Sequence, residues 1–200
     1  MKNIVLMMAI GFGLALLAPK VSGQLDSGQP AEQNAPEAEG LEAWSKIYQL
    51  VSHPRCANCH VADGTPMWSG PHYGKTIPHA MYVGGDPELL LGNPGMMCTT
   101  CHMAENSAKL HGPPGNEVWH LPPKEMVWWN KSSAEICAQL KDPARNGDRT
   151  LEEIAEHIAN DNLVAWGWAP GPGRQPAPFS AKEAANFITS WSAQGAPCPQ

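Results

Sequence analysis

Apolar residues recur at helical spacing near the start and end of the chain. Between residues 41 and 51 they lie three and four positions apart, which is typical of one face of an amphipathic helix. These residues are Leu41, Trp44, Ile47, Tyr48 and Val51. Further along, Ser132, Thr150 and Ser180 are each followed three positions later by Glu. This capping-box pattern predicts three more helices, the first ending near Lys141 and the last near Gly195.

Two other segments lack such a pattern. Residues 61–97 show little periodicity and much Gly, Pro, His and Met, which predicts a loop that wraps a ligand rather than a sheet. Residues 24–40 are rich in Gln, Pro, Glu, Ala and Gly and hold few apolar side chains, which predicts a disordered linker. We therefore expect a mainly α, loop-rich domain over residues 41–200, with few strands or none.

The N-terminus has the layout of a secretory signal peptide. Lys2 precedes an apolar stretch over residues 4–18, and small residues suited to cleavage follow at 21–23. The stretch is shorter than the roughly 20 residues that a spanning helix needs. We expect residues 1–23 to be removed and the mature protein to be periplasmic. Contact with the membrane is expected only if this segment stays as an anchor.

The charge of the chain limits its partners. Residues 1–23 hold Lys2 and Lys20 and no acid, so the 13 basic residues fall to 11 against 19 acidic ones, a formal charge of −8. An acidic surface disfavours nucleic acid and suits a partner with a basic patch.

Two short motifs carry the most specific chemical signal. Residues 56–60 and 98–102 each read Cys-x-x-Cys-His, the pattern of covalent c-type haem attachment. Thiols three positions apart lie on the same side of a helical turn, so both can form thioethers with one porphyrin. The adjacent His60 and His102 are then the expected proximal iron ligands.

The four motif cysteines also permit another site. Cys56, Cys59, Cys98 and Cys101 have spacings that suit a structural zinc ion. That alternative leaves both following histidines without a role. Only 38 residues separate Cys59 from Cys98, too few for a separate domain around one haem. We therefore expect two covalent haems to share one core.

Sixth iron ligands are harder to assign from the sequence. His79 follows His60 by 19 positions and His120 follows His102 by 18, so each motif with its next histidine forms a weak repeat. His79 and His120 are the expected distal ligands, either within each unit or crossed between units. His53 is an alternative, as are four methionines that offer thioethers: Met81, Met96, Met97 and Met126. We expect His157, on the second C-terminal helix, to be an ordinary surface or core histidine, with iron ligation as the alternative.

Three further features support this interpretation. Cys137 and Cys198 are left over and should pair in an oxidising compartment, the alternative being two separate buried thiols. Arg174 is a candidate partner for a haem propionate. Tryptophans between residues 163 and 174 could cover a haem, or could simply pack.

The chain also resembles a family of small, secreted proteobacterial dihaem c-type proteins. The resemblance covers roughly residues 53–199. Four segments carry it: His53-Pro54-Arg55-Cys56 with its motif, Trp119-His120-Leu121, residues 136–143 (ICAQLKDP) and Trp166-Gly167-Trp168. Members are often labelled as an isoquinoline 1-oxidoreductase subunit. Because nothing in this sequence resembles a molybdopterin site, the label implies at most an electron acceptor for such a dehydrogenase.

These observations predict an electron carrier rather than an enzyme. We expect two covalent haems c to relay single electrons between a dehydrogenase and a respiratory acceptor, with no small-molecule substrate. The alternative is a haem enzyme, such as a peroxidase or small-molecule reductase, in which one iron keeps an open position. A redox or gas sensor is a third class, for which the chain offers no signalling domain.

Overall fold

The computed structural model describes residues 34–69, 75–79, 92–93 and 95–200 of the 200-residue chain. The expected signal peptide, residues 24–33 of the expected linker and Met81 lie outside these residues. Over the described part the fold is mainly α, as predicted. In chain order the elements are α1 (Ala35–Val51), α2 (Pro54–Ala57), β1 (Met67–Ser69), β2 (Thr76–Pro78), β3 (Gly92–Asn93), β4 (Met96–Met97), a 3₁₀ turn η1 (Cys98–Thr100), α3 (Ser133–Leu140), α4 (Pro143–Asn146), α5 (Leu151–Asn160), α6 (Asn162–Ala165) and α7 (Ala181–Ala193). None of the described helices is both long and apolar enough to span a membrane.

Helix α1 begins earlier than the sequence predicts. The linker was expected to reach residue 40, but the helix starts at Ala35. Asn34 caps it by accepting a hydrogen bond from the backbone N–H of Glu37 at 3.0 Å. Gly40 is buried so closely that a Cβ there would lie 2.5 Å from Pro197 Cγ. The first turns are therefore fixed by a cap and by close packing of a glycine, neither of which adds to an apolar periodicity.

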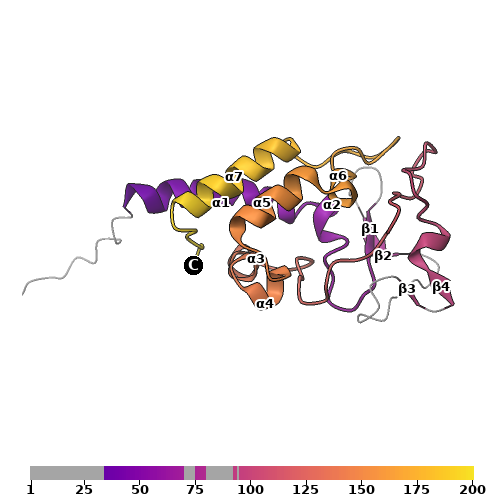
Figure 1. The fold of residues 1–200 in the computed structure, drawn as a ribbon, viewed down its shortest axis with the longest axis horizontal. Helices are drawn as coiled ribbons and strands as arrows, with labels where there is room; N and C mark the ends of the chain where they lie inside the picture. Colours follow the sequence, from indigo (N-terminus) through magenta and orange to yellow (C-terminus); the bar gives the residue numbers. More distant parts are fainter. Residues whose placement is uncertain (1–33, 70–74, 80–91, 94) are drawn as a thin grey trace, which may run out of the picture. The chain divides into compact units, whose positions relative to one another are not determined.

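The core forms where α7 packs against both α1 and α5, which lie beside it in Figure 1. Trp44 of α1 and Trp191 of α7 are almost fully buried, with ring centres 5.0 Å apart. Ile47 and Ile188 are buried beside them at 1 % exposure each. Helices α1 and α7 therefore each present one apolar face to the other.

All three predicted capping boxes are present. Ser132, Thr150 and Ser180 each accept from the N–H three residues on, and the Glu at that position accepts from the N–H of the cap. These reciprocal bonds satisfy N–H groups that a helix start leaves without intrahelical partners. The boxes therefore mark the first residues of α3, α5 and α7 correctly.

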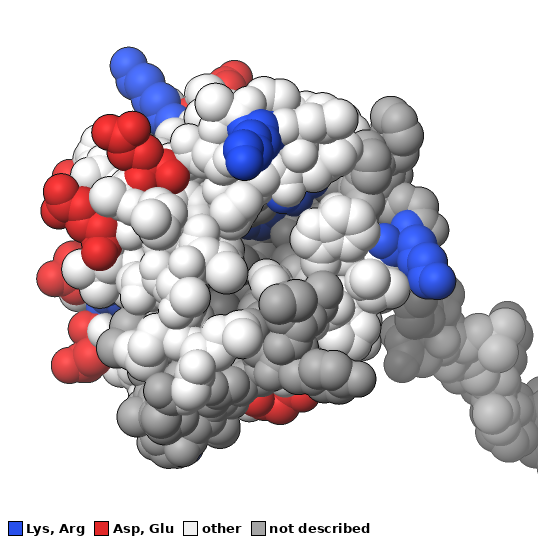
Figure 2. All heavy atoms as spheres, turned by 90° about the vertical axis from the view of Figure 1, so that its right-hand side faces the viewer, with Lys and Arg blue, Asp and Glu red and all other residues white. Residues whose placement is uncertain are grey.

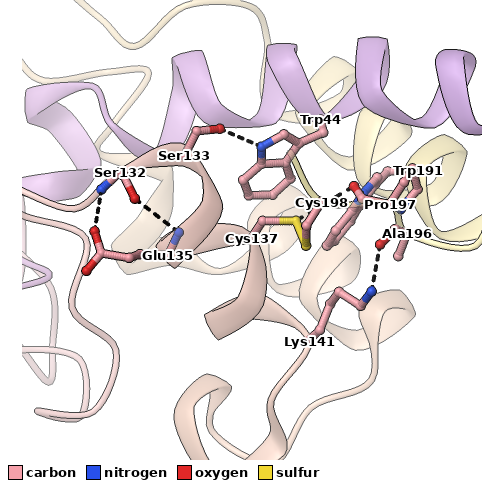
Figure 3. Close-up of a disulfide and its surroundings, with 10 residues drawn as sticks. All are labelled: Trp44, Ser132, Ser133, Glu135, Cys137, Lys141, Trp191, Ala196, Pro197 and Cys198. Atoms are coloured by element: carbon pink, nitrogen blue, oxygen red, sulfur yellow. Dashed lines mark hydrogen bonds between the residues drawn. A yellow bond between two sulfur atoms is a disulfide. The ribbon is translucent and has the colours of Figure 1, made fainter. Parts of the chain in front are cut away.

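A disulfide joins Cys137 of α3 to Cys198 near the C-terminus (Figure 3). The predicted pairing is confirmed, and the alternative of two free thiols is wrong. Two hydrogen bonds also hold this C-terminal segment. Trp191 Nε1 donates to the carbonyl of Pro197, and Lys141 Nζ donates to the carbonyl of Ala196, both at 2.8 Å. The last residues of the chain are thus fastened onto the helical core.

The segment after the first motif contains short strands that the sequence did not predict. β1 pairs antiparallel with β2, and β3 with β4. Ser69 and Thr76 lie opposite each other with their hydroxyl oxygens 2.9 Å apart, and Asn58 Nδ2 donates to Ser69 Oγ. The expectation of a loop without sheet is wrong here. Strands of two or three residues are too short to show an alternating pattern.

Candidate functional site

The first Cys-x-x-Cys-His motif is built on α2 and the turn that follows. Pro54 occupies the first turn of α2, and His53 caps it by accepting from the N–H of Arg55 at 3.2 Å. The N–H of Cys59 donates to the carbonyl of Cys56 at 3.2 Å, which places the two thiols one turn apart. This geometry is what double attachment to one flat ligand requires.

The second motif uses a tighter turn for the same purpose. Its first residues form η1, and the N–H groups of Cys101 and His102 both donate to the carbonyl of Cys98, at 3.2 and 3.0 Å. Cys101 is exposed, whereas Cys98 is half-buried. The two motifs therefore have the same local form but different surroundings.

Both motif histidines are held by one ring nitrogen. Nδ1 of His60 lies 3.0 Å from the carbonyl oxygen of Met126, and Nδ1 of His102 lies 2.8 Å from that of Pro114. Because a carbonyl only accepts, Nδ1 carries the proton and Nε2 keeps its lone pair. Metal-bound histidines in proteins typically have this second hydrogen bond, which fixes the tautomer and the ring orientation.

Each of these imidazoles also stacks on a tryptophan. The rings of His60 and Trp128 are 3.4 Å apart and nearly parallel, and those of His102 and Trp119 are 4.4 Å apart at 10°. Burial lowers the pKa of His60 to about 3 and lowers the pKa of His102 as well. Both rings are therefore neutral at pH 7, the form that binds metal.

The second motif faces a cavity of about 580 Å³, which we name the second-motif cavity. Cys98, Cys101 and His102 line it together with prolines, methionines and tryptophans, and the described residues of its wall include no Asp or Glu. Figure 2 shows a hollow with Lys or Arg atoms inside it on the side of the molecule where Figure 1 draws β4. Its size and apolar wall suit a large flat ligand.

The first motif faces a second cavity of about 160 Å³, smaller than the second-motif cavity, which we name the first-motif cavity. Cys56, Cys59 and His60 line it, opposite residues of α5 and the loop after α6. Four residues line both cavities: Arg55, Cys59, Trp119 and Trp166. The two sites therefore share a wall, in keeping with the expectation of one common core.

His79 lies close to the histidine of the second motif. It lines the second-motif cavity, and its ring centre is 6.1 Å from that of His102. Two imidazoles bound to opposite sides of one metal, at about 2 Å each, have ring centres roughly 6 Å apart. The spacing therefore matches a bis-imidazole site.

His120 lines the first-motif cavity and is not among the described residues of the second. Each candidate distal histidine thus lies beside the motif of the other repeat unit. This placement favours the crossed arrangement over the pairing of each motif with the next histidine along the chain. The spacing of the histidines along the chain does not show which cavity each one lines, because that depends on the path of the loops that carry them.

The other candidate ligands divide similarly. His53 caps α2 and is not among the described residues that line either cavity; burial, and secondarily Arg55, lowers its pKa to about 4. Met96 and Met97 line the second-motif cavity, and Met126 lines the first. Met126 already serves His60 through its carbonyl group.

Two guanidinium groups flank the ring of Trp166. Arg174, the predicted propionate partner, lines the second-motif cavity and donates from Nη2 to the carbonyl of His111 at 2.8 Å. Its Cζ lies 5.8 Å from the Trp166 ring centre, and that of Arg55 lies 5.3 Å away. Burial, and then Arg55, lowers the pKa of Arg174. Two neighbouring cations beside an apolar cavity favour an anionic ligand group.

Arg55 is the residue that the sequence reasoning missed as a functional candidate. It is only 6 % exposed, and its Nε donates to the carbonyl of Gln175 at 2.9 Å. The available signal was its position directly before the first motif, where a basic residue is brought to the cavity by α2.

Buried donors provide a direct test of whether haem fits. Nε1 of Trp128 and Nε1 of Trp168 are buried without a hydrogen-bond partner among the described residues, and both side chains line the first-motif cavity. Leaving such donors unsatisfied costs about 1–3 kcal/mol each. A porphyrin carries two carboxylates that could accept from them, so these two donors fit that group.

The zinc alternative finds less support. Burial is the main cause that raises the pKa of Cys56 to about 12 and that of Cys59 to about 11, whereas thiolates are the form that binds zinc. In the part of the chain that the structure describes, no three His, Cys, Asp or Glu side chains converge to hold a metal ion. The four motif cysteines are therefore not arranged as a tetrahedral site.

Fold and site together define a mainly α domain with two adjoining apolar cavities, each bordered by a Cys-x-x-Cys-His turn. Comparisons with protein-family models, curated proteins and solved structures found no match. The resemblance to dihaem c-type proteins therefore stays a prediction from the sequence.

Proposed function

We propose that this protein is a dihaem c-type cytochrome that transfers single electrons in the periplasm. The observation that carries the proposal is the paired arrangement of the motifs. Each has a histidine whose Nδ1 is held by a backbone carbonyl, whose ring stacks on tryptophan, and whose cavity is also lined by the two cysteines of the same motif.

The residues have separate roles in this proposal. Cys56 with Cys59, and Cys98 with Cys101, attach the two porphyrins, and His60 and His102 bind the irons. When bound, each haem supplies an iron centre that changes oxidation state by one electron. The chain itself orients the imidazoles, excludes water with apolar walls, and offers cations to the propionates.

The shared wall supports electron exchange between the two sites. Cys59 and Trp119 belong to both cavities, so the sites are separated by side chains rather than by an intervening domain. The exposed Cys101 gives the second site the more open edge, and we assign exchange with redox partners to that edge. The acidic mature chain suits partners with basic surfaces, such as a dehydrogenase or a respiratory acceptor.

The test is expression with a c-type haem maturation system, followed by a pyridine haemochrome count and optical spectra with and without carbon monoxide. We expect two haems per chain and reduced spectra unchanged by the gas, because both irons hold protein ligands on both sides. A count of zero would overturn the proposal. Two haems with a carbon monoxide-shifted Soret band would replace the carrier by the open-iron enzyme.

A further inference from the structure

One face of α5 forms part of the first-motif cavity. The residues that line the cavity recur at spacings of three and four along this helix and its C-cap: Ile154, His157, Ile158 and Asp161. A histidine therefore stands among apolar side chains on a rigid element. Helix α5 is itself fixed by its packing against α7.

His157 is held by a carboxylate one helical turn away. Its Nδ1 lies 3.4 Å from Asp161 Oδ2, so Nε2 is the nitrogen available to a ligand. A carboxylate, a histidine and a metal in this order form a common arrangement, in which the carboxylate orients the ring and raises its basicity. His157 is half-buried, and Asp161 also caps α6 by accepting from the N–H groups of Leu163 and Val164.

His120, the predicted distal ligand, is placed differently. It is exposed and lies outside the helices and strands, and its Nδ1 donates to the carbonyl of the next residue, Leu121, at 2.9 Å. A ligand that must stay on iron through changes of oxidation state benefits from a rigid support. Of His120 and His157, which line the first-motif cavity together with His60, His157 has that support.

We propose that His157, oriented by Asp161, is the sixth ligand of the iron at the first motif, in place of His120. This inference rests on the proposed dihaem function. It gives the two sites different distal supports: a helix residue with a carboxylate behind it at the first motif, and His79, directly after β2, at the second.

The test compares His157→Ala with the matched variant His120→Ala in the haem-loaded protein. We expect both to keep two haems, but only His157→Ala to convert about half of the ferric haem to a high-spin species by electron paramagnetic resonance. Added imidazole should restore the low-spin signal. The reverse pattern, or low-spin haem throughout in His157→Ala, would overturn the assignment while leaving the dihaem function intact; absence of haem from the unmodified protein would overturn both.

Two further variants keep the test usable if His157→Ala does not fold. His157→Met keeps a side chain that can bind iron. In this variant the spectrum of one of the two haems should change from that of two histidine ligands to that of one histidine and one methionine. Asp161→Asn should lower the basicity of the ring and raise the midpoint potential of one haem only. Unchanged spectra in His157→Met and unchanged midpoint potentials in Asp161→Asn would contradict the assignment.

Discussion

The two Cys-x-x-Cys-His motifs share a local pattern but sit in opposite settings. The first lies shortly after α1, and both its middle residues, Ala57 and Asn58, and the preceding Arg55 are buried. The second lies on a 3₁₀ turn with Cys101 exposed. Large apolar side chains near it also face solvent, Met103 and Leu110 at 66 % and 68 % exposure.

This difference separates what a motif determines from what its surroundings determine. The five residues set the local turn, and in both motifs residues outside it supply the histidine with a carbonyl acceptor and a stacked tryptophan. The surrounding fold sets how much water reaches each site. Because solvent exposure lowers the potential of a haem, we expect the first site to have the higher midpoint potential in a redox titration.

Removing the disulfide should have the largest effect on this contrast. In the chain-entropy model a bridge between Cys137 and Cys198, 61 positions apart, contributes about 4 kcal/mol. We expect the Cys137→Ala/Cys198→Ala variant to lose about that much free energy of unfolding in urea. The helices that wall the first site should unfold at a lower urea concentration than the one at which the haem spectrum of the second site changes. If both changes occur at the same urea concentration, the two sites do not differ in this way.

The two stacked tryptophans offer a matched pair. Trp128 and Trp119 are buried to similar extents, at 8 % and 6 % exposure, but only Trp128 belongs to the main hydrophobic core. We expect Trp128→Ala to cost about 3 kcal/mol of unfolding free energy and Trp119→Ala clearly less. Equal losses by chemical denaturation would show that the second site is as firmly packed as the first.

Gly40 tests how α1 meets the C-terminal tail. In Gly40→Ala the new Cβ would lie 2.5 Å from Pro197 Cγ and 2.7 Å from its Cδ, and overpacking of this kind outweighs the helix propensity gained. We expect a net loss of about 1–2 kcal/mol in thermal or urea unfolding. Glu42→Ala, at an exposed position of the same helix, is the control and should stay within about 0.5 kcal/mol.

The smallest expected effect is on acid stability. The hydrogen bond from Lys131, followed by those from Ser132, lowers the pKa of Glu135 to about 2. A carboxyl whose pKa is lowered on folding stabilises the protein above its unfolded pKa, and that contribution is lost as pH falls toward 2. Glu135→Gln should therefore reduce the slope of helix loss, followed by circular dichroism, between about pH 4.5 and 2. An unchanged acid profile would contradict it, with Glu42→Gln as the control.

Local signals were enough for the helical half of the molecule. The three capping boxes located α3, α5 and α7, and apolar periodicity located α1 from residue 41 onward. The start of α1 was missed because it depends on a polar cap and on a glycine fitted against Pro197, far away in sequence. The strands β1 to β4 were missed because they are short and are held by pairing with each other.

The candidate site was predictable only in part, for the same reason. The residues of each motif are neighbours in sequence, so the pattern identified them. Which cavity His79 and His120 line depends on the course of the loops that carry them, so the spacing of 18 and 19 positions left both the within-unit and the crossed arrangement open. The sequence did not single out Arg55, and it gave His157 only as a less favoured ligand, because the roles proposed for both come from the cavities they line, which no local pattern encodes.

The shared wall has a consequence for how such a protein can arise. Arg55, Cys59, Trp119 and Trp166 each belong to both cavities, although they come from segments far apart in sequence. A gene fragment encoding either motif alone would lack part of its own cavity. The two sites are therefore not independent modules, and a substitution in the shared wall changes both cavities at once.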